Sequence, residues 1–135
     1  MDKVIPWLRS IVAFPLGLVA IRLFHMAGRQ LTPQAYGLLD SDAERVLSIV
    51  LATIAGILGS FVVGAIARHR IWLHMIIFLT LMLVIDLGFL RGTAATQPMW
   101  FKALVLATLP LQAWIGGQLA ALTFRKADRS SPVLT

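Results

Sequence analysis

The sequence predicts an all-α membrane protein in which four transmembrane helices form one antiparallel bundle. Its composition is 59% hydrophobic and 13% charged, whereas soluble proteins are about 25% charged. Four apolar stretches are each long enough to cross a bilayer, which takes about 20 helical residues. Charged or turn-forming residues separate these stretches. The expected spans are residues 5–26, 46–67, 71–90 and 99–124.

The first span resembles a signal peptide at its start, because Lys3 and Arg9 accompany an apolar run. However, no clean small-x-small cleavage site follows, and Arg22 interrupts the end of the run. We therefore expect residues 5–26 to form a retained membrane helix.

The loop before the second span carries two helix-start signals. Thr32-Pro33 is typical of an N-cap followed by proline at the first helical position, so a short interfacial helix that carries Tyr36 is expected. Ser41 and Glu44 match a capping box, in which each side chain bonds the backbone N–H of the other residue. The second helix should therefore begin close to Ser41.

The third and fourth spans follow short connections. Arg68-His69-Arg70 leaves room only for a tight turn, which makes the second and third helices antiparallel neighbours. Residues 1–124 then form a single domain, and the basic residues 125–135 form a cytoplasmic tail. Residues 49–53 resemble residues 104–108. Either a duplicated helical hairpin, giving two parallel repeats, or chance similarity of apolar segments explains this.

Basic residues predict the orientation, because lysine and arginine collect on the cytoplasmic side of membrane proteins. With a cytoplasmic N-terminus, that side holds seven of them and the other side holds four, with Arg22 counted on neither. We expect a multi-pass protein of a bacterial-type inner (plasma) membrane with both termini in the cytoplasm. The seven are Lys3, Arg9, Arg68, Arg70, Arg125, Lys126 and Arg129; the four are Arg29, Arg45, Arg91 and Lys102.

The second span carries a stripe of small residues, one on each successive turn. Its members are Ala52, Gly56, Ser60 and Gly64. Small residues let another helix backbone approach closely, and such packing drives helix association in lipid. The stripe predicts a helix-packing interface, either with a second membrane chain or inside the same bundle. The fourth span has a shorter version at Ala113, Gly117 and Ala121.

Arg22 and Asp86 are the most informative charges. Both lie about four residues from the outer ends of the expected spans 5–26 and 71–90. A charge inside a spanning helix costs about 2.5–3.5 kcal/mol on insertion scales and usually faces the bundle interior or a partner. Three interpretations stay open: an intramembrane ion pair, a proton- or cation-coupling role for Asp86, and separate snorkelling of both side chains.

Thr108 and Gln112 lie one helical turn apart in the fourth span, on either side of Pro110. This spacing predicts a polar seam, and the proline frees a backbone carbonyl that neighbouring groups must satisfy. The seam either lines a ligand cavity or makes one interhelical hydrogen bond. Trp114 lies too deep for an interfacial belt, and we expect it to pack.

Several classes of function lack support. The chain has no cysteine, and His25 and His74 belong to opposite sides of the membrane, so we expect no metal and no cofactor. No nucleophile–base arrangement or phosphate-binding glycine loop is present, so we expect no enzyme. The net charge of +6 lies at the ends of the spans, which indicates contact with the lipid bilayer and no nucleic acid.

These features lead to two hypotheses of function. The first is a non-enzymatic protein that acts by helix packing, as an accessory or assembly subunit of a larger complex or as a structural homo-oligomer. The alternative is a small oligomeric channel, or an ion- or proton-coupled transporter, that uses Asp86 and Gln112.

Overall fold

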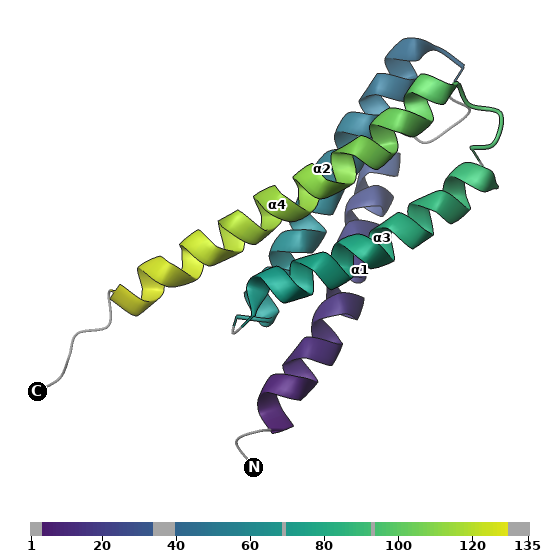
Figure 1. Cartoon of the computed structure of the whole chain (residues 1–135). Helices are drawn as coiled ribbons and strands as arrows, with labels where there is room; N and C mark the ends of the chain where they lie inside the picture. Colours follow the sequence, from purple (N-terminus) through teal and green to yellow (C-terminus); the bar gives the residue numbers. More distant parts are fainter. Residues whose placement is uncertain (1–3, 34–39, 69, 93, 130–135) are drawn as a thin grey trace, which may run out of the picture.

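In this computed structural model the chain forms four α-helices (Figure 1). The structure describes residues 4–33, 40–68, 70–92 and 94–129. Within these ranges the four helices are between 21 and 31 residues long. They are α1 (Val4–Leu31), α2 (Asp42–Ile66), α3 (Ile71–Arg91) and α4 (Met99–Arg129).

All four helices contain a segment long and apolar enough to cross a membrane. The shortest has 21 residues. At 1.5 Å per residue this is about 32 Å, which matches a hydrocarbon core of about 30 Å. The prediction of an all-α chain with four candidate membrane-spanning helices is thus confirmed. The segments are Leu8–Leu31, Asp42–Ile66, Ile71–Arg91 and Met99–Phe124.

Two helices extend further than hydropathy predicts. α1 continues to Leu31, and Thr32 completes its last turn by donating from both its N–H and its hydroxyl to the Gly28 carbonyl, at 2.7 and 2.9 Å. α4 continues to Arg129, so it includes the first five residues of the expected tail 125–135. Polar residues with good helix propensity extend a helix without adding to its apolar run. The expected interfacial helix at Tyr36 lies outside the described residues.

α2 begins with the predicted capping box. The Ser41 hydroxyl accepts a hydrogen bond from the Glu44 N–H at 3.2 Å, and the Glu44 carboxylate accepts one from the Ser41 N–H at 3.0 Å. Arg45 then pairs with Asp42 at 2.7 Å and donates from Nε to Gln97 Oε1 at 2.8 Å. The second of these contacts ties the first turn of α2 to the α3–α4 connection.

The connection between α2 and α3 is a tight turn, as the sequence predicts. α2 ends at Ile66, α3 begins at Ile71, and the Arg70 N–H donates to the Ala67 carbonyl at 3.1 Å. We call this end of the molecule, with the α2–α3 connection, the turn end. The opposite end, where the α1–α2 and α3–α4 connections lie, is the loop end.

α2 is the central helix. It packs against all three other helices, most extensively against α4 and α1, and α4 also packs against α3. Consecutive helices run in opposite directions, so α2 and α4 run in the same direction, side by side (Figure 1). The largest interface therefore joins two parallel helices that are distant in the sequence.

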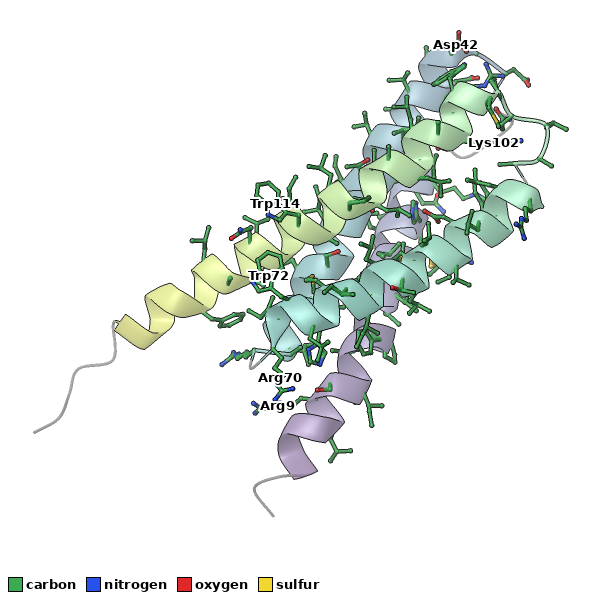
Figure 2. The ribbon with its side chains drawn as sticks, in the orientation of Figure 1. Arg9, Asp42, Arg70, Trp72, Lys102 and Trp114 are labelled. Carbon is green, nitrogen blue, oxygen red and sulfur yellow. The ribbon has the colours of Figure 1, made fainter. Side chains whose placement is uncertain are left out.

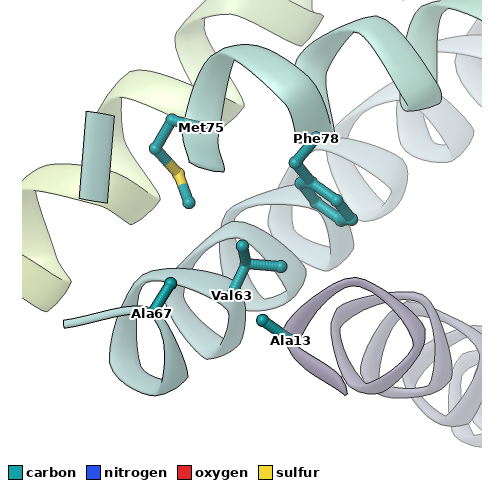
Figure 3. Close-up of a cluster of buried hydrophobic side chains, with 5 residues drawn as sticks. All are labelled: Ala13, Val63, Ala67, Met75 and Phe78. Atoms are coloured by element: carbon teal, nitrogen blue, oxygen red, sulfur yellow. The ribbon is translucent and has the colours of Figure 1, made fainter. Parts of the chain in front are cut away.

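The buried apolar side chains form two clusters. The cluster in the turn-end half joins α1, α2 and α3 (Figure 3) and comprises Ala13, Val63, Ala67, Met75 and Phe78. His74 lies buried beside it, where its ring stacks on Phe14 with centroids 5.7 Å apart. The second cluster, at the loop end, comprises Leu90, Ala94 and Phe101.

Candidate functional site

A small cavity lies between the two apolar clusters, in the loop-end half of the helices. Its volume is about 60 Å³, and all four helices contribute to its lining. The polar side chains are His25 from α1, Asp86 from α3, and Thr108 and Gln112 from α4. The remaining lining residues are apolar or small: Ile21, Ile49, Ala52, Gly56, Met82 and Val105.

Gln112 and Thr108 form the polar seam on α4. Gln112 Nε2 donates to the Thr108 hydroxyl at 3.0 Å, and that hydroxyl donates to the Val105 carbonyl at 2.8 Å. The four-residue spacing places both side chains on one helix face, where they can meet. Gln112 is buried, with 5% of its surface exposed, so this hydrogen bond fixes the amide in the wall of the cavity.

Gly56 supplies the space that the Gln112 amide occupies. A methyl group on Gly56 would collide with Oε1 and Cδ of Gln112. The absence of a side chain on α2 therefore lets a glutamine from α4 point between the two helices. A contact of this kind depends on the pairing of two helices, which neither segment reveals alone.

Asp86 and Arg22 lie at a similar level but in different surroundings. Asp86 is partly buried and lines the cavity. Ile21 and His25 also line the cavity, and they belong to the same turn of α1 as Arg22, which sets the common level. Arg22 is exposed on the outside of α1. Among the described residues the salt bridge that forms is Arg45–Asp42, and Arg22 and Asp86 do not form one.

His25 is the cavity residue that sequence reasoning missed. Its ring lies edge-on to Phe24, with centroids 6.3 Å apart, and the residue lines the cavity opposite Asp86 on α3. In the sequence it was considered only as a metal ligand. His25 follows Ile21 by one turn and so shares its face of α1, but only the structure shows that this face points to the cavity.

The small-residue stripe of α2 packs inside the chain. Gly56, Ser60 and Gly64 are buried against α4, where their counterparts are Gln112, Gly116 and Ala120. Ala52 continues the stripe into the cavity lining. In the structure, three members of the stripe thus contact α4 of the same chain.

The α4 side of this interface is one residue away from the expected Ala113, Gly117 and Ala121. Gly116 faces Ser60 together with the backbone of Ile57 and Phe61, whereas Gly117 faces Met75 and Trp72 of α3. α4 thus uses small residues on two faces, one toward α2 and one toward α3. Adjacent positions on a helix point about 100° apart, which is the difference between the two faces.

The volume of the cavity limits what it can hold. One water molecule needs about 10–15 Å³ of such space, so about 60 Å³ accommodates a few waters or a small cation. Pockets for drug-sized ligands measure about 300–1,000 Å³. The described residues contain no group of three or more His, Cys, Asp or Glu side chains placed to hold a metal ion. By its volume alone, the cavity suits a proton, water or a small cation.

Comparison with known proteins yields no family model, curated protein or solved structure that matches this chain.

Proposed function

We propose that this chain is a four-span integral membrane protein whose polar cavity binds a proton or a small cation during transport across the membrane. Four helices that are long and apolar enough to span support the membrane assignment. The position of Asp86 in a cavity shared by all four helices carries the proposal of transport.

The argument from Asp86 is energetic. A carboxylate within a spanning helix costs about 2.5–3.5 kcal/mol on insertion scales, and such groups line ion or proton pathways in many membrane proteins. Here the carboxylate shares its cavity with an imidazole, a hydroxyl and an amide. Carboxylate, hydroxyl and amide oxygens are ligands for hard cations, and imidazole exchanges protons near neutral pH.

We further propose that the protein lies in a bacterial-type inner membrane as one antiparallel bundle with both termini in the cytoplasm. The excess of lysine and arginine at the turn end supports this orientation. The cavity would then lie in the outer half of the membrane, closer to the α1–α2 and α3–α4 connections. A bound ion would have to cross the turn-end cluster around Phe78 to reach the cytoplasm.

The test is flux into liposomes that contain the purified chain. We expect a proton, Na⁺ or K⁺ gradient to dissipate faster than in protein-free liposomes, and Asp86→Asn to lower this rate at least tenfold. Gln112→Leu should lower it as well, because leucine removes the amide from the cavity wall. Asp40→Asn is the matched control, since Asp40 is an exposed carboxylate at the loop end, and its flux should stay at the wild-type level.

Two outcomes would overturn the proposal. One is a flux that equals that of protein-free liposomes for all three cations. The other is wild-type flux in Asp86→Asn. Thermal unfolding of each variant in detergent separates loss of transport from loss of folding.

A second function, as an accessory or assembly subunit or a structural homo-oligomer, is favoured by α1. Only 11% of its spanning segment is buried, against 22–33% for the other three helices, and Arg22 lies on its exposed side. A neighbouring membrane helix with a carboxylate at this level would compensate that charge. Here we expect a partner of fixed stoichiometry to co-purify from native membranes and to be lost in Arg22→Gln. If the chain extracted from native membranes is a monomer without any co-purified partner, this function is excluded.

A further inference from the structure

An apolar groove between α3 and α4 opens on the outer surface of the helices. Its volume is about 140 Å³, and its walls include Trp72 and Leu79 of α3 and Pro110, Ala113 and Trp114 of α4. Trp114, which we expected to pack, is 56% exposed, and Trp72 is 47% exposed. The small side chain of Ala113, opposite larger side chains on α3, leaves the hollow unfilled. Figure 2 shows the two tryptophans on these neighbouring helices.

Arg68 lies at the turn end of α4, beyond the groove. Its guanidinium carbon is 4.2 Å from the centre of the Phe124 ring, and its Nε donates to the Ala65 carbonyl at 3.3 Å. Gly117, which faces Trp72, precedes Phe124 by seven residues, or about 10 Å of helix. Phe124, and Arg68 with it, therefore lies about 10 Å beyond the contact of Gly117 with Trp72, on the same face of α4 that Gly117 turns toward α3.

The turn end has a single sign of charge among the side chains that the structure describes there. Arg9 and Arg70 are exposed at this end (Figure 2), as is Arg68, and no acidic side chain lies among them. In the sequence, the last turns of α4 carry three basic residues and one acidic residue, namely Arg125, Lys126, Asp128 and Arg129. Each basic residue near an anionic membrane surface contributes attraction of about 1 kcal/mol.

We propose that this groove binds an anionic phospholipid, with an acyl chain along Trp72 and Trp114 and the phosphate on Arg68. The groove itself offers only apolar side chains, which suits a hydrocarbon chain. The spacing also fits at Trp72, the second residue of α3, because a tryptophan near a helix end sits at the boundary of headgroup and hydrocarbon, and the phosphate lies further out. The arginine fork matches phosphate oxygens, and ring stacking on Phe124 holds it in place.

The test measures quenching of tryptophan fluorescence by lipids with brominated acyl chains. The protein used is the variant Trp7→Phe, Trp100→Phe, in which the remaining tryptophans, Trp72 and Trp114, report the groove. It is placed in nanodiscs of brominated phosphatidylcholine. Unbrominated phosphatidylglycerol is then added. Unbrominated phosphatidylglycerol that enters the groove displaces the quencher, so we expect quenching to fall. The fall should correspond to an enrichment of phosphatidylglycerol in the groove of about five-fold over the bulk bilayer, which is the factor expected from one arginine contact.

Variants assign the preference to Arg68. Arg68→Gln should return quenching to the value expected from the lipid ratio of the bulk bilayer. Arg68→Lys, which keeps the charge, should retain most of the enrichment of phosphatidylglycerol. Arg91→Gln, an exposed arginine at the loop end, is the control and should behave as wild type. Inorganic phosphate at millimolar concentration should leave the enrichment unchanged, because it lacks the acyl chain.

Three results would overturn the proposal. The first is quenching that follows the bulk lipid ratio in the wild-type background. The second is full enrichment in Arg68→Gln. The third is the absence of quenching by any brominated lipid, which would show that a protein partner or a second copy covers the groove. Thermal unfolding in the same nanodiscs verifies that each variant is folded.

Discussion

Asp86 and Arg22 illustrate how two charges at one level acquire different environments. Asp86 faces a cavity with three other polar side chains, and Arg22 faces away from the bundle. An exposed arginine on a long side chain can extend toward the interface, whereas a short aspartate that faces inward cannot. The structure thus gives different surroundings to two charges that the sequence places at a similar depth.

We predict that Arg22→Gln and Asp86→Asn act independently on stability. Because no salt bridge joins them, the double variant should differ from the sum of the single variants by no more than about 0.5 kcal/mol. Equilibrium unfolding in mixed micelles measures all three variants. If the double variant or the charge exchange instead recovers most of the loss, the two residues pair in the membrane, within one chain or between two.

At the scale of residues, the sequence singles out polar groups inside the spans but does not show how they assemble. Asp86, Thr108 and Gln112 were predicted as site residues, and all three line the cavity. Arg22, which the sequence associates with Asp86 alone, is exposed outside the cavity, and His25 lines the cavity although the sequence does not single it out as a site residue. Residue type and depth can be read from the sequence. The direction of a side chain around a helix that is apolar on all sides cannot, because such a helix lacks a clear amphipathic face.

Among the elements, the α2–α4 interface depends most on small residues. Gly116 contacts the backbone of α2 at Ile57 and Phe61, and a methyl group there would lie 2.7 and 2.8 Å from backbone atoms. Backbone in the middle of a helix cannot move aside as a flexible side chain can. Gly56 differs, because the group that faces it is the end of the Gln112 side chain.

We predict that Gly116→Ala destabilises the protein by about 1–3 kcal/mol through overpacking. Gly88→Ala is the control, because no atom lies within 4 Å of the added methyl group. Since alanine is the better helix former, that variant should be neutral or more stable by up to about 1 kcal/mol. Unfolding in detergent compares the two. Equal stability of both variants would mean that α2 and α4 do not pack as described.

The elements themselves were largely predictable. The four spans, the capping box at Ser41 and the turn before Arg70 follow from local chemistry, which a single segment of sequence contains. The helix ends at Leu31 and Arg129 could not be predicted in this way, because hydropathy marks the membrane boundary and a helix can continue beyond it. The pairing of α2 with α4 was also hidden, since it joins segments about 55 residues apart.

For the whole molecule, the proposed orientation predicts opposite accessibility of its two ends. Cysteines introduced at Ala95, in the exposed α3–α4 connection, and at Ser131, after α4, should label from opposite sides of the membrane. The absence of natural cysteine makes each site unique. A membrane-impermeant maleimide applied to intact and opened spheroplasts gives the readout. Labelling of both sites from the same side would rule out four spans.

The central position of α2 has a consequence for biogenesis. α1 and α2 leave the ribosome first and can join through the close approach of Gly17 and Gly59. The other face of α2 packs against α4, which is the last helix to be synthesised. Until α4 inserts, Gly56, Ser60 and Gly64 lie open to lipid, and the cavity lacks the wall formed by Thr108 and Gln112. The complete lining of the cavity therefore forms only when translation of this chain has passed its fourth helix.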